Sequence, residues 1–166
     1  MLNFMDEKKG EIIIRSAEKR DLAGILVLMK KLHKNESEKY GNVLSLDWVN
    51  LYGRKIVGDC IADSDNFILV AESDGKVVAF LRAGIYRNEM LWKIGKGAEI
   101  YEIFIDKGFR SQKIGGRLME MFLDWCKPKK IDYILINVAA RNSEAIKFYE
   151  NFGFGSNQII MEKKII

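Results

Sequence analysis

The sequence has 166 residues, 48% of them hydrophobic, and its 27 basic and 23 acidic side chains give a formal net charge of +4. This length predicts one domain spanning residues 1–166, with enough apolar residues for a core of ordinary size. The mild positive charge suits an anionic ligand but does not favour a nucleic-acid-binding protein. One histidine and two widely separated cysteines exclude a His-rich or CxxC metal site, and we expect both thiols to be reduced and mostly buried.

No apolar run approaches the roughly 20 residues that a membrane-spanning helix needs. Residues 1–10, which we interpret as a loose leader, lack the apolar stretch of a signal peptide. These absences favour a cytoplasmic protein that does not bind a membrane. His33 comes late in a Lys-rich helix, and we expect it to lie at the surface rather than in a catalytic site.

The first half of the chain predicts two helices followed by a hairpin. The expected elements are a strand at 12–14, a helix from Ser16 to about His33, a polar loop at 35–42, a helix from Ser45 to about Ile61, and strands at 67–71 and 76–86. Asp74-Gly75 is a typical hairpin turn, because both residue types tolerate the positive φ that such turns require. The two strands beside it should therefore pair antiparallel.

The second half alternates strands and helices. The expected elements are a loop at 88–97, a strand at 98–106, a helix from near Ile114 that Pro128 ends, a strand at 133–138, a helix capped by Asn142 and ended by Gly153, and a last strand at about 158–165. The apolar run at 133–138 favours a strand buried on both faces, which pairs in parallel with 98–106. The whole order predicts a mixed α+β fold, with a twisted, mostly antiparallel sheet, one parallel strand pair and about four flanking helices.

The stretch from Glu99 to Arg117 combines a β-branched strand with a loop rich in glycine and basic residues that leads into a helix. Backbone N–H groups at such a helix N-terminus favour an anion, so we interpret the loop as a cradle, most simply for a pyrophosphate. The loop has neither the Walker A nor the Rossmann pattern. It matches a third pattern, Arg/Gln-x-x-Gly-x-Gly/Ala after a strand, in Arg110-Ser111-Gln112-Lys113-Ile114-Gly115, with Lys113 in place of the first glycine.

This loop resembles the acetyl-CoA-binding motif of the GNAT family of N-acetyltransferases. The segment from Asn142 to Phe154 is similar to the family's downstream signature, Asn-x-x-Ala-x-x-Phe-Tyr-x-x-x-Gly-Phe. Two motifs in the correct order make the resemblance specific over 99–154, and the order of elements extends it to about 12–166. The resemblance implies a GNAT-like fold with a splayed parallel strand pair, acetyl-CoA as co-substrate and no metal.

The resemblance also implies where acetyl-CoA binds. The cofactor would lie where the strand at 99–106 splays away from the strand at 133–138, with backbone groups of the first strand pairing with its pantetheine amides. Amides of residues 110–116 would hold the pyrophosphate, and Asn142 would contact the pantetheine arm. The implied cofactor-binding residues are Ile103, Phe104, Ile105, Arg110, Ser111, Gln112, Lys113, Ile114, Gly115, Gly116, Asn142, Ala145 and Tyr149.

Lys113 departs from the family pattern and leaves two alternatives. If the backbone there needs a positive φ, lysine is strained. If it does not, the ammonium adds a charge beside the phosphates. We favour the second alternative, because Lys107, Arg110 and Arg117 already make the loop basic.

Acetyl transfer to an amine needs a base for an ammonium with a pKa near roughly 10.4, and an acid for a thiolate whose parent pKa is roughly 8.5. Its place in the signature makes Tyr149 the implied acid. Glu99 is our first choice of base and Glu102 the second, and ordered water is a further alternative. Strand alternation puts the two glutamates on opposite faces unless a bulge intervenes. Asn137 stands where relatives that acetylate protein N-termini have a glutamate, which argues against that mechanism.

The predicted function is an acetyl-CoA-dependent N-acetyltransferase acting by direct attack in a ternary complex. Its acceptor would be a primary amine: a polyamine, another small amine, or a protein lysine or N-terminus. Acidic and aromatic residues of the early helices and loops suit a cationic amine, although we expect most to be core or solvated residues: Glu36, Glu38, Tyr40, Asp47, Trp48, Tyr52, Tyr86, Glu89 and Trp92. The alternative is a non-catalytic acetyl-CoA sensor or interaction module, against which Glu99 and Tyr149 argue. A homodimer is plausible through the isoleucines of the last strand, Ile159, Ile160, Ile165 and Ile166.

Overall fold

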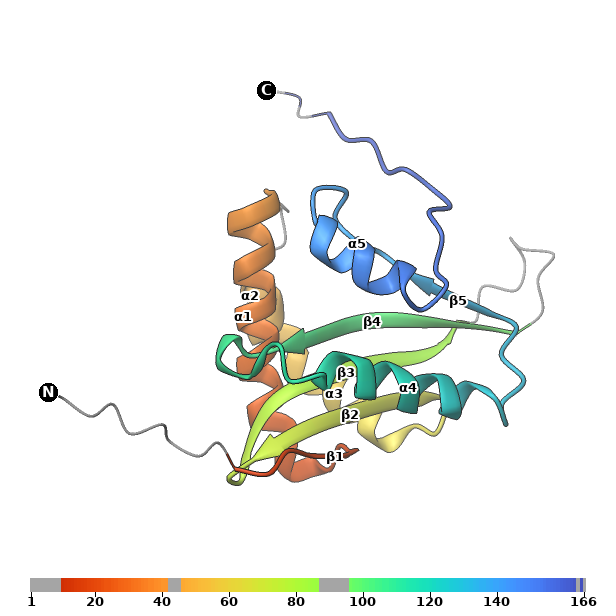
Figure 1. Cartoon of the computed structure of the whole chain (residues 1–166). Helices are drawn as coiled ribbons and strands as arrows, with labels where there is room; N and C mark the ends of the chain where they lie inside the picture. The colour runs from red at the N-terminus through yellow and green to blue at the C-terminus, as the bar shows by residue number, and fades with distance from the viewer. Residues whose placement is uncertain (1–9, 42–45, 87–95, 164, 166) are drawn as a thin grey trace, which may run out of the picture.

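Five strands form one sheet in the order β1-β2-β3-β4-β5 (Figure 1). The computed structural model describes residues 10–41, 46–86, 96–163 and 165. The first three strand pairs are antiparallel, whereas β4 and β5 run parallel. The predicted α+β architecture is therefore confirmed.

The elements follow the predicted order closely as far as α5. They are β1 (Ile13–Ser16), a 3-10 turn (Lys19–Asp21), α1 (Leu22–Tyr40), α2 (Leu46–Trp48), a π-helical segment (Val49–Gly53), α3 (Arg54–Ala62), β2 (Asn66–Ser73), β3 (Lys76–Tyr86), β4 (Gly97–Ile105), a second 3-10 turn (Lys107–Phe109), α4 (Ile114–Cys126), β5 (Tyr133–Ile136) and α5 (Ser143–Glu150). No described helix is long and apolar enough to cross a membrane.

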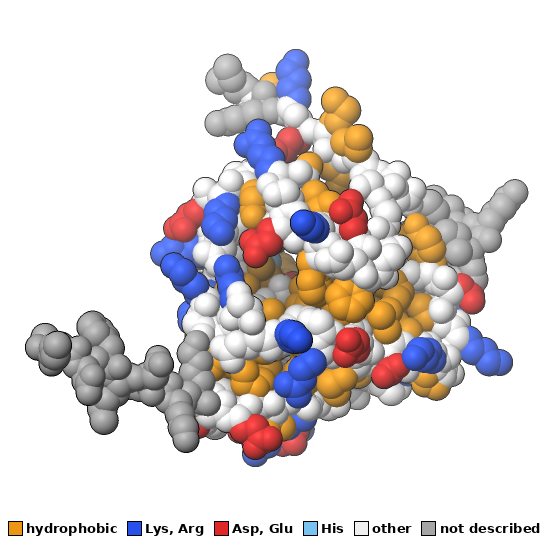
Figure 2. Space-filling model, viewed as in Figure 1, with side chains coloured by type: hydrophobic (Ala, Val, Ile, Leu, Met, Phe, Trp, Pro, Cys, Tyr) orange, Lys and Arg blue, Asp and Glu red, His pale blue; other side chains and the backbone are white. Residues whose placement is uncertain are grey.

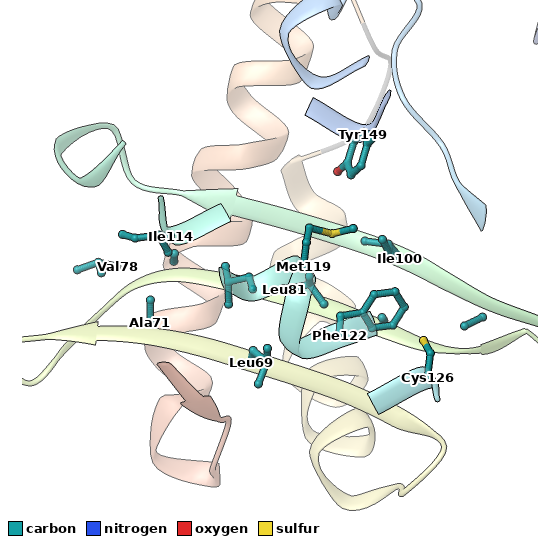
Figure 3. Close-up of a cluster of buried hydrophobic side chains, with 14 residues drawn as sticks. Leu69, Ala71, Val78, Leu81, Ile100, Ile114, Met119, Phe122, Cys126 and Tyr149 are labelled. Atoms are coloured by element: carbon teal, nitrogen blue, oxygen red, sulfur yellow. The ribbon is translucent and has the colours of Figure 1, made fainter. Parts of the chain in front are cut away.

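Helices cover both faces of the sheet, and each face has its own core. On one face, Leu69 and Leu81 of the strands pack with Leu118 and Phe122 of α4, and Tyr149 of α5 joins this cluster (Figure 3). On the other face, neighbouring strand residues such as Val70 and Phe80 pack against α1 and α3. This alternation is the two-residue period that a strand imposes.

The first helix is longer than predicted. α1 continues through residues 35–40, which were expected to form a polar loop, and it ends at Gly41 in the left-handed conformation with φ 73°. Polar residues suit the solvent side of a helix as well as they suit a loop, and Lys34 and Glu38 form an i,i+4 pair there. Residue 42, the last of the expected loop, lies outside the described residues.

Several other local predictions hold. Asp74 and Gly75 form the expected hairpin turn, with φ of 49° and 73°, and the helix predicted near 45–61 is found as α2, the π-helical segment and α3. Both cysteines are free, and burial raises the pKa of Cys126 to about 11. Most of the loop predicted at 88–97 lies outside the described residues.

The C-terminal end of the sheet differs from the prediction. β5 was expected to be buried on both faces, but all four of its residues are half-buried because it is the edge strand. The last strand expected at 158–165 is not formed in the described residues, and Ile159, Ile160 and Met161 are 84–90% exposed. A β-forming sequence becomes a strand only where another strand supplies hydrogen bonds, and this segment has no strand partner within the described chain.

Candidate functional site

β4 and β5 separate part-way along their length. Their parallel pairing joins Gly97–Ile100 to Tyr133–Ile136 and stops there. β4 continues to Ile105, and no described strand lies on the β5 side of residues 101–105. The three residues expected to pair with pantetheine, Ile103–Ile105, lie in this separated part, as the resemblance implied for a splayed pair.

A bulge in β4 decides which side chains share a face. Arg82 of β3 pairs with Glu102 and the next residue, Ala83, pairs with Ile100, so Tyr101 has no partner in the register. The extra residue reverses the alternation, and Glu99 and Glu102 therefore lie on the same face of β4. The charge of Arg82 acts on both carboxyl groups. Opposite faces were expected unless a bulge intervened, and the structure has such a bulge.

Glu102 is held in a buried hydrogen-bonded cluster at this bulge. It is 8% exposed; Arg82 Nε donates to its Oε2 at 2.9 Å, and His33 Nε2 donates to its Oε1 at 3.1 Å. Burial alone raises the pKa of Glu102, but the hydrogen bond from His33 and the charge of Arg82 outweigh burial and lower it. The carboxylate therefore stays ionised with both oxygens engaged.

His33 does not lie at the surface as predicted. It is 8% exposed and packs edge-on against Trp48, with ring centroids 5.8 Å apart. α1 places it toward the sheet because it follows the buried Ile25 and Met29 at intervals of four residues, which is one helix face. That spacing is a sequence signal that could have predicted its burial.

Glu99 lies in a different environment from Glu102. Its side chain is half-buried, and Asn137 Nδ2 donates to its Oε1 at 3.3 Å. Burial raises the pKa of Glu99, and Arg82 and Asn137 counteract only part of that rise. Glu99 forms no ion pair in the described structure, so this carboxyl group is able to exchange a proton.

Tyr149 of α5 faces the sheet across the same region. Its side chain is 6% exposed, and its ring makes edge contacts with Phe148 and Phe154 at centroid distances of 5.2 and 5.6 Å. Burial raises the pKa of the phenol, and the negative charge of Glu36 on α1 raises it further. Tyr149 therefore keeps its proton at neutral pH and remains a hydrogen donor.

The loop before α4 has an unusual backbone. Ser111 and Lys113 both have positive φ, 63° and 59°, and Lys113 is the N-cap of α4. The alternative that we favoured, in which Lys113 does not need a positive φ, is therefore wrong. Lys113 adopts the left-handed conformation at the position where the family pattern has its first glycine. Successive N–H groups in such alternating conformations form a concave anion site.

Two further motif residues have defined structural roles. A Cβ on Gly115 would approach Ile105 Cδ1 at 3.2 Å and Phe148 Cε2 at 3.4 Å, so this glycine lets α4 pack closely. Asn142 is the N-cap of α5, and its side-chain oxygen accepts from the backbone N–H of Ala145 at 3.1 Å. Both motifs thus position the helices that border the gap between β4 and β5.

The surface is hollowed between α1, α5 and β4, with hydrophobic side chains inside and charged side chains of both signs around the rim (Figure 2). Two residues of this region, His33 and Arg82, were not predicted to lie there. The sequence does contain a signal for Arg82: a charged residue within the apolar run of β3 must have a charged partner if it is buried. Of the acceptor candidates, Glu89 and Trp92 lie outside the described residues.

Known proteins share both the sequence pattern and the fold. The model of the acetyltransferase (GNAT) family matches residues 29–154. An uncharacterised N-acetyltransferase of Methanocaldococcus jannaschii is 28% identical over 153 residues, a match that covers 89% of this chain and 62% of that protein. The chain thus spans about three-fifths of the length of that curated relative.

Two solved structures have the same fold. A mutant protein of Bacillus halodurans superposes with a TM-score of 0.81 at 20% identity, covering 93% of this chain and 99% of that one. An aminoglycoside N-acetyltransferase in complex with CoA superposes with a TM-score of 0.66 at 18% identity, covering 93% and 100%. Since the family model matches well over half of the chain and the elements fall in the same arrangement, this protein belongs to the GNAT family of acetyltransferases.

Proposed function

We propose that this protein transfers the acetyl group of acetyl-CoA to a primary amine by direct attack in a ternary complex. The observation that carries the proposal is the gap between β4 and β5, with a buried phenol, Tyr149, on one side and a half-buried carboxyl group, Glu99, on the bulged strand. These two groups suit an acid and a base, because the Tyr149 phenol keeps its proton at neutral pH and the Glu99 carboxyl group can take up and release one.

The residues present suit acetyl-CoA. The separated part of β4, Ile103–Ile105, has no strand on its β5 side in the described chain, which leaves backbone groups for the pantetheine amides. The positive φ angles of Ser111 and Lys113 bend the loop into an anion cradle at the start of α4. Acetyl-CoA would supply the activated acetyl group, and these residues would bind and orient it.

Glu99 is the better candidate for the base. Glu102 has both oxygens engaged by Arg82 and His33 and a lowered pKa, so accepting a proton would break a buried ion pair. Glu99 has only an amide partner and a raised pKa. We propose that Glu99 takes the proton of the amine, directly or through one water, and that Tyr149 gives a proton to the thiolate.

The test is CoA release from acetyl-CoA with a panel of amines: an alkyl monoamine, an alkyl diamine, an aminoglycoside, glucosamine 6-phosphate and peptides with a free lysine or N-terminus. We expect acetyl-CoA-dependent release of CoA with at least one of these amines and formation of its N-acetyl product. Binding of acetyl-CoA without acetylation of any amine would contradict the proposal and favour a sensor.

Lys113→Gly tests two effects of the lysine: strain in the left-handed backbone, measured by stability, and charge beside the phosphates, measured by the KM for acetyl-CoA. Removing a side chain from the left-handed region should raise the free energy of unfolding by about 1 kcal/mol in a urea titration. The loss of the ammonium should raise the KM for acetyl-CoA. Lys130, which is exposed and has φ 54° in a turn away from this loop, is the matched control: Lys130→Gly should give the stabilisation alone. An unchanged KM for Lys113→Gly would show that the Lys113 ammonium points away from the phosphates.

We also propose a homodimer in which residues 158–165 of one copy pair with the edge strand β5 of the other. Both elements expose unsatisfied β-forming chain in the described structure, and Ile159 and Ile160 are 88% and 84% exposed. Sedimentation should give a dimer for the full chain and a monomer for the double variant Ile159→Lys, Ile160→Lys. Ile13→Lys, at an exposed isoleucine on the opposite edge strand, should remain dimeric. A monomeric full chain would contradict this proposal.

A further inference from the structure

Glu36, in the penultimate turn of α1, is a half-buried carboxylate with no hydrogen-bond or ion-pair partner among the described residues. Its neighbour on the same helix, Glu38, is exposed and pairs with Lys34 at 3.8 Å. A carboxylate that loses water without gaining a partner is costly, so an unpaired one beside a reaction site indicates a missing cation.

The position of Glu36 follows from its neighbours. His33, one helical turn earlier, fixes α1 against the β4 bulge through its 3.1 Å hydrogen bond to Glu102. The charge of Glu36 acts on Glu102 of β4 and on Tyr149 of α5. The carboxylate therefore lies near both β4 and α5. Figure 2 shows the surface hollowed between α1, α5 and β4.

The balance of charge at this place favours a cationic ligand. Arg82 and His33, which lie beside the site, both donate hydrogen bonds to Glu102. Glu36 and Glu99 remain without an ion-pair partner in the described structure. Burial raises the pKa of both, and neighbouring basic groups counteract only part of that rise. A ligand with two positive nitrogens would complement two such carboxylates.

We propose that Glu36 binds a charged nitrogen of the acceptor, and that the acceptor is a small alkyl diamine. This inference rests on the proposed acetyltransferase function. The ammonium at one end of the diamine loses a proton to Glu99, and the free amine forms a C–N bond to the acetyl carbon as the C–S bond breaks. The thiolate takes a proton from Tyr149, and the phenolate takes up the second proton that the new amide nitrogen releases, giving CoA and an N-acetyl diamine. The second nitrogen stays protonated and pairs with Glu36 throughout.

The pairing of Glu36 with the second nitrogen is tested by comparing a diamine and a monoamine substrate in the wild-type protein and in two variants. The wild-type protein should acetylate 1,4-diaminobutane with a kcat/KM about tenfold or more above that for 1-aminobutane, the range expected when a charged hydrogen bond is lost. Glu36→Gln keeps the shape of the side chain and should reduce this ratio to near one, mainly through a higher KM for the diamine. Glu38→Gln, the matched control on the same helix, should keep the wild-type ratio.

The outcomes separate this inference from the proposed function. Equal kcat/KM values for the two amines in the wild type, or a ratio that persists in Glu36→Gln, would overturn the role of Glu36 and leave the acetyltransferase proposal standing. A calorimetric titration of CoA-loaded protein with 1,4-diaminobutane gives an independent reading. Glu36-dependent binding without transfer to any amine would contradict the proposed function instead. Absence of both transfer and binding would overturn both.

Discussion

Tyr149→Phe is expected to lower kcat by about 10²–10⁴-fold, the range typical for loss of a positioned proton donor. The phenol is buried, and its raised pKa keeps it protonated. A departing thiolate beside it would otherwise leave without a proton. The ring contacts with Phe148 and Phe154 survive the substitution, so the KM for acetyl-CoA should change little. Steady-state kinetics of CoA release measure both quantities.

Tyr133→Phe is a matched control for this substitution. It removes a hydroxyl at the start of β5, where Asn157 donates to it at 3.2 Å, and it leaves the separated part of the strands intact. Its kcat should equal that of the wild type. If Tyr149→Phe also kept the wild-type kcat, another group or water would be the proton donor. If it raised the KM for acetyl-CoA without lowering kcat, Tyr149 would act in binding alone.

The parts of the fold that were predictable are those that local signals decide. Asp74-Gly75 fits a turn that needs positive φ at both positions, and the turn formed where predicted. α4 starts at Ile114 and ends just before Pro128, as the loop pattern and the proline indicate. In each case, residues within one or two turns of chain determine the conformation, so one sequence is enough to predict it.

The parts that were missed depend on distant residues. The spacing along α1 indicates that His33 is buried, but its hydrogen-bond partner, Glu102, lies 69 residues away and could not be predicted from that spacing. The faces of Glu99 and Glu102 depend on the bulge at Tyr101, which is set by pairing with β3. The segment at 158–165 has β-forming residues but no described strand beside it. The composition of a segment can favour a β-strand, but whether the strand forms depends on partners elsewhere in the chain.

The family motifs indicated which elements border the gap between β4 and β5, but not the environments of the side chains there. Tyr149 is brought to the gap between β4 and β5 because α5 carries its own cap, Asn142. The left-handed φ of Lys113 follows from the loop geometry of the motif even though the residue is not glycine. The partners of Glu102 were invisible to the motif, since His33 and Arg82 belong to α1 and β3.

Glu99→Gln is expected to lower kcat/KM for the amine by about 10²–10⁴-fold near neutral pH and to change the shape of the pH profile. Burial places the pKa of Glu99 above its usual value. A base works only when deprotonated, so wild-type activity should fall as pH drops through this raised pKa. The Gln variant has no such group, and its activity should follow the fraction of free amine and keep rising toward the pKa of the amine.

The two profiles should therefore converge at high pH, because an amine that has already lost its proton needs no base. Asn137→Ala is an informative companion, since it removes the hydrogen bond that stabilises ionised Glu99. That change should move the acidic limb to higher pH while leaving the maximal rate similar. If the acidic limb of the pH profile stayed at its wild-type position in Glu99→Gln, the base would be ordered water or a group other than Glu99. Glu102 would not be that group, because its carboxylate is held in the ion pair with Arg82.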